Sequence, residues 1–145
     1  MPKKKRQLSS SVQKKLKKAA ERVMKNAHAP YSNFRVGSAI LLTNGKTFTG
    51  CNVENASYGM TNCAERTAIF SAVAELGPRI EIAAVAVTND HGVACSPCGA
   101  CRQVINEFGP KIPVVSICDG EERIETTLDA LLPHAFGPHN LEQGF

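Results

Sequence analysis

This sequence has no long apolar segment and no apolar leader. None of its hydrophobic runs approaches the roughly 20 residues that a helix needs to cross a bilayer. Its first residues are basic rather than apolar, which argues against a secretory signal. We therefore expect a cytoplasmic protein with no membrane partner. In a reducing compartment, its six cysteines should serve as metal ligands, catalytic groups or core residues rather than form disulfides.

Internal repeats, low-complexity stretches and a clear domain boundary are also missing. A chain of 145 residues fits one domain with a single core, and 43% hydrophobic with 21% charged residues is ordinary for a globular protein. We expect a basic, flexible tail over residues 1–12 and one domain over residues 13–145.

The main part of the chain lacks an excess of basic residues. The formal net charge is +4, yet residues 1–25 hold ten Lys/Arg against one Glu, whereas residues 26–145 hold seven Lys/Arg against twelve Asp/Glu. Neutralising phosphates supplies most of the affinity for a polynucleotide, so this distribution argues against such a partner. The run at 3–6 (KKKR) fits a nuclear-import signal, a nucleic-acid tail or a solvated end, and we favour the last.

Helix-like and strand-like patterns alternate along the sequence. Apolar residues recur every three to four positions after Ser11, which predicts an amphipathic helix that ends before Pro30. The order of the later patterns predicts an α/β fold, a three-layer α/β/α sandwich around a mixed sheet of about five strands. The expected elements are a hairpin of 36–42 and 47–53, helices at 62–76 and 99–108, strands at 80–88 and 114–118, and a short strand and helix after them.

Three cysteines stand at the starts of the two central helices. Cys63 begins the first of these helices, and Cys98 and Cys101 begin the second. A helix N-terminus favours thiolate, and a two-residue gap lets both sulfurs of a C-x-x-C turn reach one zinc ion. Both N-termini can open on the same edge of the sheet, because each helix lies between two strands. Alone, the C-x-x-C spacing also fits a redox pair, half of a zinc ribbon or coincidence.

The number of ligands favours a catalytic zinc site. A structural site normally has four protein ligands, whereas a catalytic one has three and keeps a position for water. Glu65 follows Cys63 within the same helical turn, close to the metal without having to bind it. That is the position expected of a proton shuttle. Arg66 either donates to the thiolates and offsets their charge, or is a surface or salt-bridged residue.

The other cysteines and the histidines fit less specific roles. Cys95 forms a rival C-x-x-C pair with Cys98, but Pro97 just before Cys98 favours a helix that starts there. Cys51 and Cys118 lie in strand patterns and are expected to be buried as small apolar groups. The four histidines show no paired spacing and are expected at turns or on the surface.

Cys63, Cys98 and Cys101 belong to longer motifs, and in these motifs the chain closely resembles the small, three-cysteine cytidine deaminases. C-A-E followed by P-C-x-x-C is the deaminase zinc signature, with Cys in place of the first His. The resemblance extends from about Lys14 to the C-terminus. The matching segments are 29–37 (APYSNFRVG), 51–59 (CNVENASYG), 63–68 (CAERTA), 96–104 (SPCGACRQV) and 131–138 (LLPHAFGP).

The resemblance implies a reaction and the roles of the metal and of Glu65 in it. It implies hydrolysis of cytidine and 2'-deoxycytidine to uridine and 2'-deoxyuridine with release of ammonia, a step of pyrimidine salvage. One Zn²⁺ per chain would supply the hydroxide that attacks C4 of the base, and Glu65 would move protons to N3 and the leaving amine.

The resemblance also implies how substrate is held. Asn52 and Glu54 would bind the ribose hydroxyls, Phe34 would pack on the base, and the Ala64 backbone N–H would hold the pyrimidine. Asn52 and Glu54 share one face of a strand, as two groups that bind one sugar must, although this spacing also fits a solvated face. Members of this family are homotetramers with shared sites, to which the positions of Ala56, Tyr58 and Phe136 would contribute.

Three other functions remain open at this point. A deaminase of RNA or DNA would need a basic strand-binding surface, which the acidic body of the chain does not provide. A deaminase of a nucleoside-like antibiotic is a closer alternative, but the pair of Asn52 and Glu54 favours a plain ribose. A zinc-stabilised binding module would need a fourth protein ligand and would leave Glu65 without a role.

Overall fold

The computed structural model describes residues 7–141, so the basic run at 3–6 lies outside the described residues. Its strands form one sheet in the order β2-β1-β3-β4-β5, in which β3 and β4 are parallel and the other neighbours antiparallel. The strands are β1 (Val36–Leu42), β2 (Thr47–Cys51), β3 (Ile82–Asn89), β4 (Pro113–Ser116) and β5 (Ile124–Thr127). The helices are α1 (Ser10–Met24), α2 (Ala64–Leu76), α3 (Gly99–Glu107) and α4 (Leu128–Leu131), with 3₁₀ turns at Tyr58–Met60 and Pro138–Asn140.

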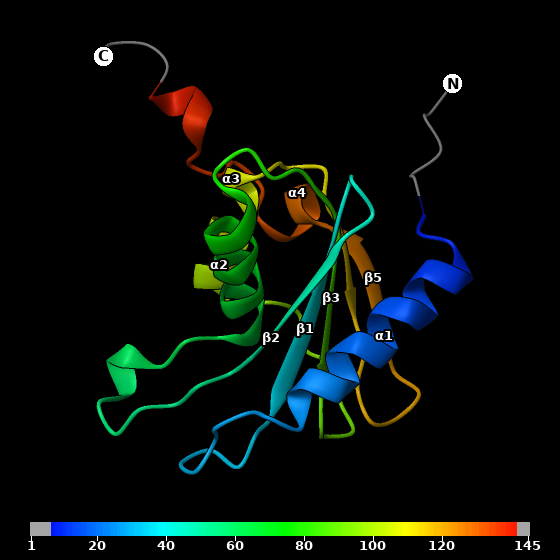
Figure 1. The fold of residues 1–145 in the computed structure, drawn as a ribbon, viewed down its shortest axis with the longest axis vertical. Coiled ribbons are helices and arrows are strands. Elements are labelled where there is room, and N and C mark those ends of the chain that lie inside the picture. Colours follow the sequence, from blue (N-terminus) through cyan, green and yellow to red (C-terminus); the bar gives the residue numbers. More distant parts are fainter. Residues whose placement is uncertain (1–6, 142–145) are drawn as a thin grey trace.

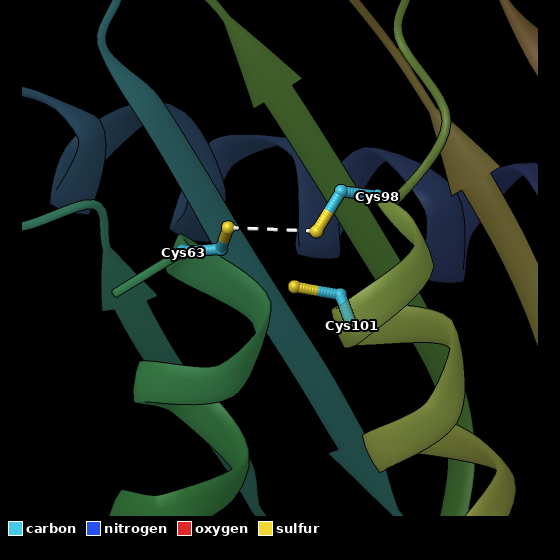
Figure 2. A group of neighbouring side chains, drawn as sticks. All are labelled: Cys63, Cys98 and Cys101. Carbon is cyan, nitrogen blue, oxygen red and sulfur yellow. Dashed lines mark hydrogen bonds between the residues drawn. The ribbon is translucent and has the colours of Figure 1, made fainter. Parts of the chain in front are cut away.

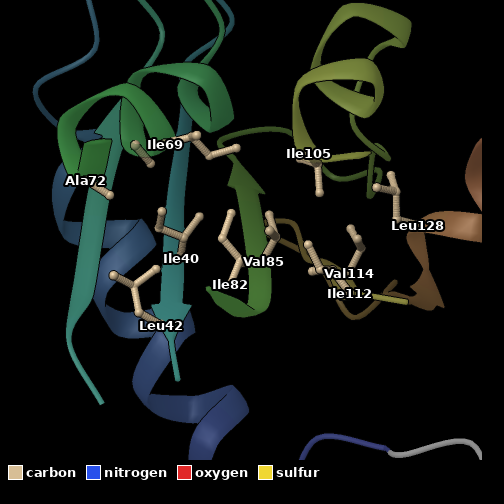
Figure 3. Close-up of a cluster of buried hydrophobic side chains, with 11 residues drawn as sticks. Ile40, Leu42, Ile69, Ala72, Ile82, Val85, Ile105, Ile112, Val114 and Leu128 are labelled. Atoms are coloured by element: carbon tan, nitrogen blue, oxygen red, sulfur yellow. The ribbon is translucent and has the colours of Figure 1, made fainter. Parts of the chain in front are cut away.

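The sheet separates two helical layers (Figure 1). Leu16 and Ala20 of α1 pack on small residues of one face, such as Ala39 and Ala84. The main core fills the opposite face, between the sheet and α2, α3 and α4 (Figure 3). The predicted three-layer fold with a mixed five-stranded sheet is therefore confirmed. None of the helices in residues 7–141 has the length and apolar character needed to span a membrane.

The topology brings two helix N-termini to one edge of the sheet. Because β1 is antiparallel to both β2 and β3, those two strands run in the same direction, and β4 runs with them. Helices α2 and α3 are thus crossovers between parallel strands. Each begins beyond the carboxyl end of the strand before it, which is where ligands bind in open α/β sheets.

Gly50 seats the start of α2 against the sheet. A Cβ at this position would lie 2.4 Å from the Ala68 nitrogen and 2.6 Å from the Ala64 oxygen. These are backbone atoms of α2, so no side-chain rotation relieves the contact. The first turns of α2 can therefore approach β2 this closely only because residue 50 is glycine.

Several element boundaries differ from those expected, among them the start of α2 at Ala64 rather than residue 62 and the end of β4 at Ser116 rather than residue 118. Helix α1 ends at Met24 rather than near Pro30, because the chain turns there and brings His28 into a backbone bridge with Val53. Strand β2 ends at Cys51 rather than at Val53, since Val53 pairs with His28 and Asn62 instead of with β1. Strand β3 begins two residues later than the pattern at 80–88 predicts.

Candidate metal centre and active site

The three cysteines converge at the N-termini of α2 and α3. Cys63 is the N-cap of α2, Cys98 is the N-cap of α3, and Cys101 lies in the first turn of α3. Their three sulfur atoms lie within 4.8 Å of one another, and the Sγ atoms of Cys63 and Cys98 are 3.7 Å apart (Figure 2). The topology of two neighbouring crossovers thus brings together ligands that are 35 residues apart in sequence.

The geometry of this cluster fits one tetrahedral zinc ion. With Zn–S bonds of ~2.3 Å, a tetrahedral ion holds its sulfurs about 3.8 Å apart. No fourth Cys, His, Asp or Glu joins the group among residues 7–141. All six cysteines, each within that range, are free thiols. Three protein ligands leave one tetrahedral position for water, as in catalytic sites.

The thiols of the cluster have very different affinities for protons. The interaction with the neighbouring Cys101 side chain, with smaller support from Arg66 and Cys98, lowers the pKa of Cys63 to about 5, although burial opposes this. The same interaction and burial raise the pKa of Cys101 far above its usual range. Protein groups alone therefore favour the thiolate of Cys63 and oppose that of Cys101, and a bound cation would favour ionisation of Cys101 as well.

Arg66 points into the cluster. Its Nη2 donates to the Cys63 sulfur at 3.3 Å, and the thiols of Cys63 and Cys101 raise the pKa of the guanidinium. Three thiolates around Zn²⁺ leave a net charge of −1, and a fixed cation in contact with one sulfur offsets it. This contact supports the charge-compensating role of Arg66 over the surface role.

Glu65 is buried beside the sulfurs. Its side chain is 5% exposed, and its carboxylate accepts a hydrogen bond from the Cys101 thiol, with 3.2 Å between oxygen and sulfur. Burial raises the pKa of its carboxyl above the usual range. A carboxyl in this position can hold and release a proton next to the metal site without acting as a ligand.

A cavity of about 430 Å³ opens beside the metal cluster. This volume lies within the range typical of small-molecule sites. Its walls come from three stretches of chain that the fold brings to one edge of the sheet. The lining residues are Ser32, Phe34 and Val36; Asn52, Glu54, Thr61, Cys63, Ala64 and Glu65; and Val87, Asn89, Cys95, Ser96 and Cys98.

Asn52 and Glu54 line this cavity and also hold the loop that carries Phe34. The Asn52 amide accepts from the Val36 N–H and donates to the Phe34 carbonyl, at 2.8 Å each. The Glu54 carboxylate accepts from the backbone N–H groups of Tyr31 and Ser32 and from the Ser32 hydroxyl. Part of their polar capacity is therefore used inside the protein, a role that the sequence did not predict.

Three predicted substrate-binding residues lie away from this cavity. Ala56 is exposed, Tyr58 is 74% exposed, and Phe136 is 60% exposed. The Tyr58 and Tyr31 rings meet in an edge-type arrangement, with ring centroids 5.7 Å apart. Within one chain, the structure does not bring these residues to the site.

Sequence reasoning missed residues that shape the site. Asn89 lines the cavity at the end of β3 and orders the following turn through bonds to the His91 N–H and the Val93 carbonyl. Arg102 holds the segment before Cys98, and its position directly after a ligand was the available signal. The rival ligand Cys95 lines the cavity but is not part of the sulfur cluster.

Comparisons with known proteins agree with this geometry. Residues 10–117 match the model of the cytidine and deoxycytidylate deaminase zinc-binding region. Cytidine deaminases of Halalkalibacterium halodurans and Sporosarcina psychrophila are each 46% identical to the chain, over 82% and 88% of it and over 89% and 93% of their own lengths.

A solved structure shows the same fold. The crystal structure of cytidine deaminase from Burkholderia pseudomallei aligns with a TM-score of 0.81 and 47% identity, covering 89% of this chain and all of that one. With a family model that spans most of the sequence and relatives of this similarity, the chain belongs to the zinc-dependent cytidine and deoxycytidylate deaminase family.

Proposed function

We propose that this protein hydrolyses the exocyclic amine of free cytidine and 2'-deoxycytidine, giving uridine or 2'-deoxyuridine and ammonia, as a step of pyrimidine salvage. The observation that carries the proposal is the cluster of three cysteines with the buried Glu65 beside it, open to a small-molecule cavity. The relatives at 46% identity are named cytidine deaminases, which supports the part of the proposal that concerns cytidine.

The chain's own residues divide the work of the reaction. Cys63, Cys98 and Cys101 would hold zinc, which when bound supplies a Lewis acid that makes water nucleophilic at neutral pH. Glu65 takes a proton from the attacking water and passes it to N3 of the ring. It then takes the second proton of the same water, from the hydroxyl now at C4, and delivers it to the departing amine as the C4 carbonyl forms. The raised pKa of Glu65 suits this task, because the group must both accept and release a proton near neutral pH.

Substrate is oriented by groups on the cavity wall. Ala64 is the first residue of α2, so its N–H has no partner within the helix and is available to a pyrimidine oxygen. Phe34 offers an apolar face to the base. The Asn52 amide retains one N–H, and the Glu54 carboxylate retains acceptor capacity, for the hydroxyls of the sugar.

The charge of the cavity favours a nucleoside over a nucleotide or a polynucleotide. Among the described residues, its lining contains two carboxyl groups and no Lys or Arg. A 5'-phosphate would enter without a compensating cation. Residues 26–145 hold more acidic than basic residues, which also disfavours binding of RNA and DNA.

We further propose that the protein is a homotetramer whose sites are shared between chains. Ala56, Tyr58 and Phe136 lie on the surface of one chain, where they could contribute to the active site of a neighbouring chain. An apolar groove lined by residues such as Phe70, Val104 and Phe108 between α2 and α3 supports assembly. A cytoplasmic location stays a prediction.

An absorbance assay tests the proposed function. Purified protein should convert cytidine and 2'-deoxycytidine, lose activity when a chelator removes zinc, and regain it when zinc is restored. CMP and dCMP serve as matched substrates that differ only by the phosphate, and they should react far more slowly. Absence of cytidine turnover by protein that contains one zinc per chain would refute the proposal.

A further inference from the structure

Arg102 makes three hydrogen bonds that tie two loops to helix α3. Its Nε donates to the Pro97 carbonyl at 2.7 Å, its Nη2 to the Ser96 hydroxyl at 2.8 Å, and its Nη1 to the Leu131 carbonyl at 2.8 Å. Two of these acceptors belong to the residues directly before Cys98. The third belongs to the end of α4, which precedes the segment that carries Phe136.

The three metal-binding cysteines differ in how firmly packing holds them. Cys101 is buried within α3, and Cys63 is partly buried, whereas Cys98 is exposed at the end of a loop. The Pro97 side chain is buried and anchors one side of that loop. The direction of the Cys98 sulfur then depends on the backbone of 96–98, which is the part that Arg102 holds.

The guanidinium is suited to this task by its shape. Its donors lie in one rigid plane, so three bonds to fixed acceptors leave the loop little freedom. Lysine has one nitrogen at the end of a flexible stem and cannot reach all three acceptors in the same geometry. Metal ligands must be held to within ~0.5 Å of their working positions, and loops achieve this only with supporting contacts.

We propose that Arg102 is a positioning residue that fixes the sulfur of Cys98 for zinc binding and links the metal site to the C-terminal segment. Among the described residues, Arg102 does not line the cavity and donates to none of the three sulfurs; it acts through the Ser96 hydroxyl and the Pro97 carbonyl. Its effect on turnover rests on the proposed function, whereas its effect on zinc retention does not.

The test measures zinc release from the metal-loaded protein to a chromogenic chelator. In Arg102→Gln, release should be about 10–100-fold faster than in wild type, the range seen when groups that orient metal ligands are removed. The visible spectrum of the Co²⁺-substituted variant should also shift, because the ligand geometry changes. Arg123→Gln makes the same chemical change at an ion pair with Glu125, and it should leave release and spectrum unchanged.

Two milder variants keep the inference testable if Arg102→Gln does not fold. Ser96→Ala removes one of the three acceptors and should accelerate release less than Arg102→Gln does. Arg102→Lys should fall closer to Arg102→Gln than to wild type, because charge alone does not position the loop. In the double variant, Ser96→Ala should add nothing to the effect of Arg102→Gln, since both remove the same interaction.

The outcomes separate positioning from general support of the fold. Release within about twofold of wild type in all variants would overturn the proposal, even if their melting temperatures fell. Faster release with a kcat loss larger than any change in KM for cytidine would support it. Wild-type protein that fails to deaminate cytidine would overturn the proposed function alone, because zinc release is measured independently of turnover.

Discussion

Glu65 combines two properties that rarely coincide in one carboxyl group. It sits in the first turn of α2, where unpaired N–H groups favour the charged form, yet it is almost completely buried, which favours the neutral form. Burial is the stronger effect, so the pKa is raised. A group balanced in this way is able to exchange protons with a substrate held in the adjacent cavity.

We expect Glu65→Gln to keep its fold and its zinc while losing about 10²–10⁴-fold in kcat, because the amide fills the same space and carries no transferable proton. Metal analysis and steady-state kinetics on cytidine measure the two properties separately. Glu75→Gln makes the same change at an exposed position of the same helix and should have no effect. Comparable turnover in Glu65→Gln would remove this residue from the mechanism.

Arg66→Ala should slow the reaction or weaken zinc retention by roughly 10–100-fold, because the Cys63 sulfur loses its hydrogen-bond donor and the site loses a positive charge. Zinc affinity and kcat are the quantities to compare. Arg79→Ala, an exposed arginine beyond the end of the same helix, is the control. If both variants behave like wild type, the contact of Arg66 with sulfur has no functional weight.

Residue spacing predicted the metal cluster but not the hydrogen bonds that hold the loops around it. The C-A-E and P-C-x-x-C motifs mark helix starts, and two helix starts on one sheet edge place Cys63, Cys98 and Cys101 together. The bonds from Asn52 to the loop of Phe34, and from Arg102 to Pro97, join segments whose relative position only the folded chain defines. Sequence periodicity carries no information about such contacts.

At the scale of elements, the approach of α2 to β2 depends on one missing side chain. Gly50→Ala places a methyl group against backbone atoms of α2 and should cost roughly 1–3 kcal/mol, which lowers the melting temperature by several degrees. Because the displaced turn carries Cys63 and Glu65, kcat should fall as well. Gly92→Ala is a matched control, since its methyl group meets open space. An equally stable and active Gly50→Ala would show that α2 shifts without consequence.

The elements were predictable where one local pattern dominated. The long apolar run of β3 and the Asn44-Gly45 turn predicted strands that exist, with bounds off by one or two residues, and the Gly77-Pro78 pair ended α2 as expected. The end of α1 and the end of β2 were misplaced, because the bridge between His28 and Val53 takes both segments out of regular structure. That bridge joins residues that are distant in sequence, which local preferences cannot report.

At the scale of the whole molecule, Phe136 has an exposed ring on a backbone that hydrogen bonds hold in place. The Phe136 carbonyl accepts hydrogen bonds from Gln103 and Asn106 of α3, which fixes the backbone while the ring stays exposed. An exposed ring on a fixed backbone suits a binding surface, because little conformational entropy remains to be lost when a partner binds.

Mixing inactive chains tests whether sites are shared. A Phe136→Ala chain keeps Glu65, and a Glu65→Gln chain keeps Phe136, so a mixed assembly contains some sites with both intact groups. We expect a tetramer by sedimentation at assay concentration and partial recovery of activity after the two chains are exchanged. Mixing Glu65→Gln with itself is the control. A fully active monomer would refute assembly and leave the deaminase assignment unaffected.

The separation of the metal ligands along the chain has a consequence for the order of folding. The β1–β2 hairpin closes locally, but the sulfurs of Cys63 and Cys98 meet only after β3 has paired with β1 and the α3 crossover has formed. Because closing so long a loop costs entropy before its contacts form, we expect the sulfur cluster to form after the folding barrier. Zinc should therefore slow unfolding strongly and change the refolding rate little, which stopped-flow measurements with and without zinc would reveal. In that case zinc release limits the rate of unfolding, and the folded chain persists for as long as the metal stays bound.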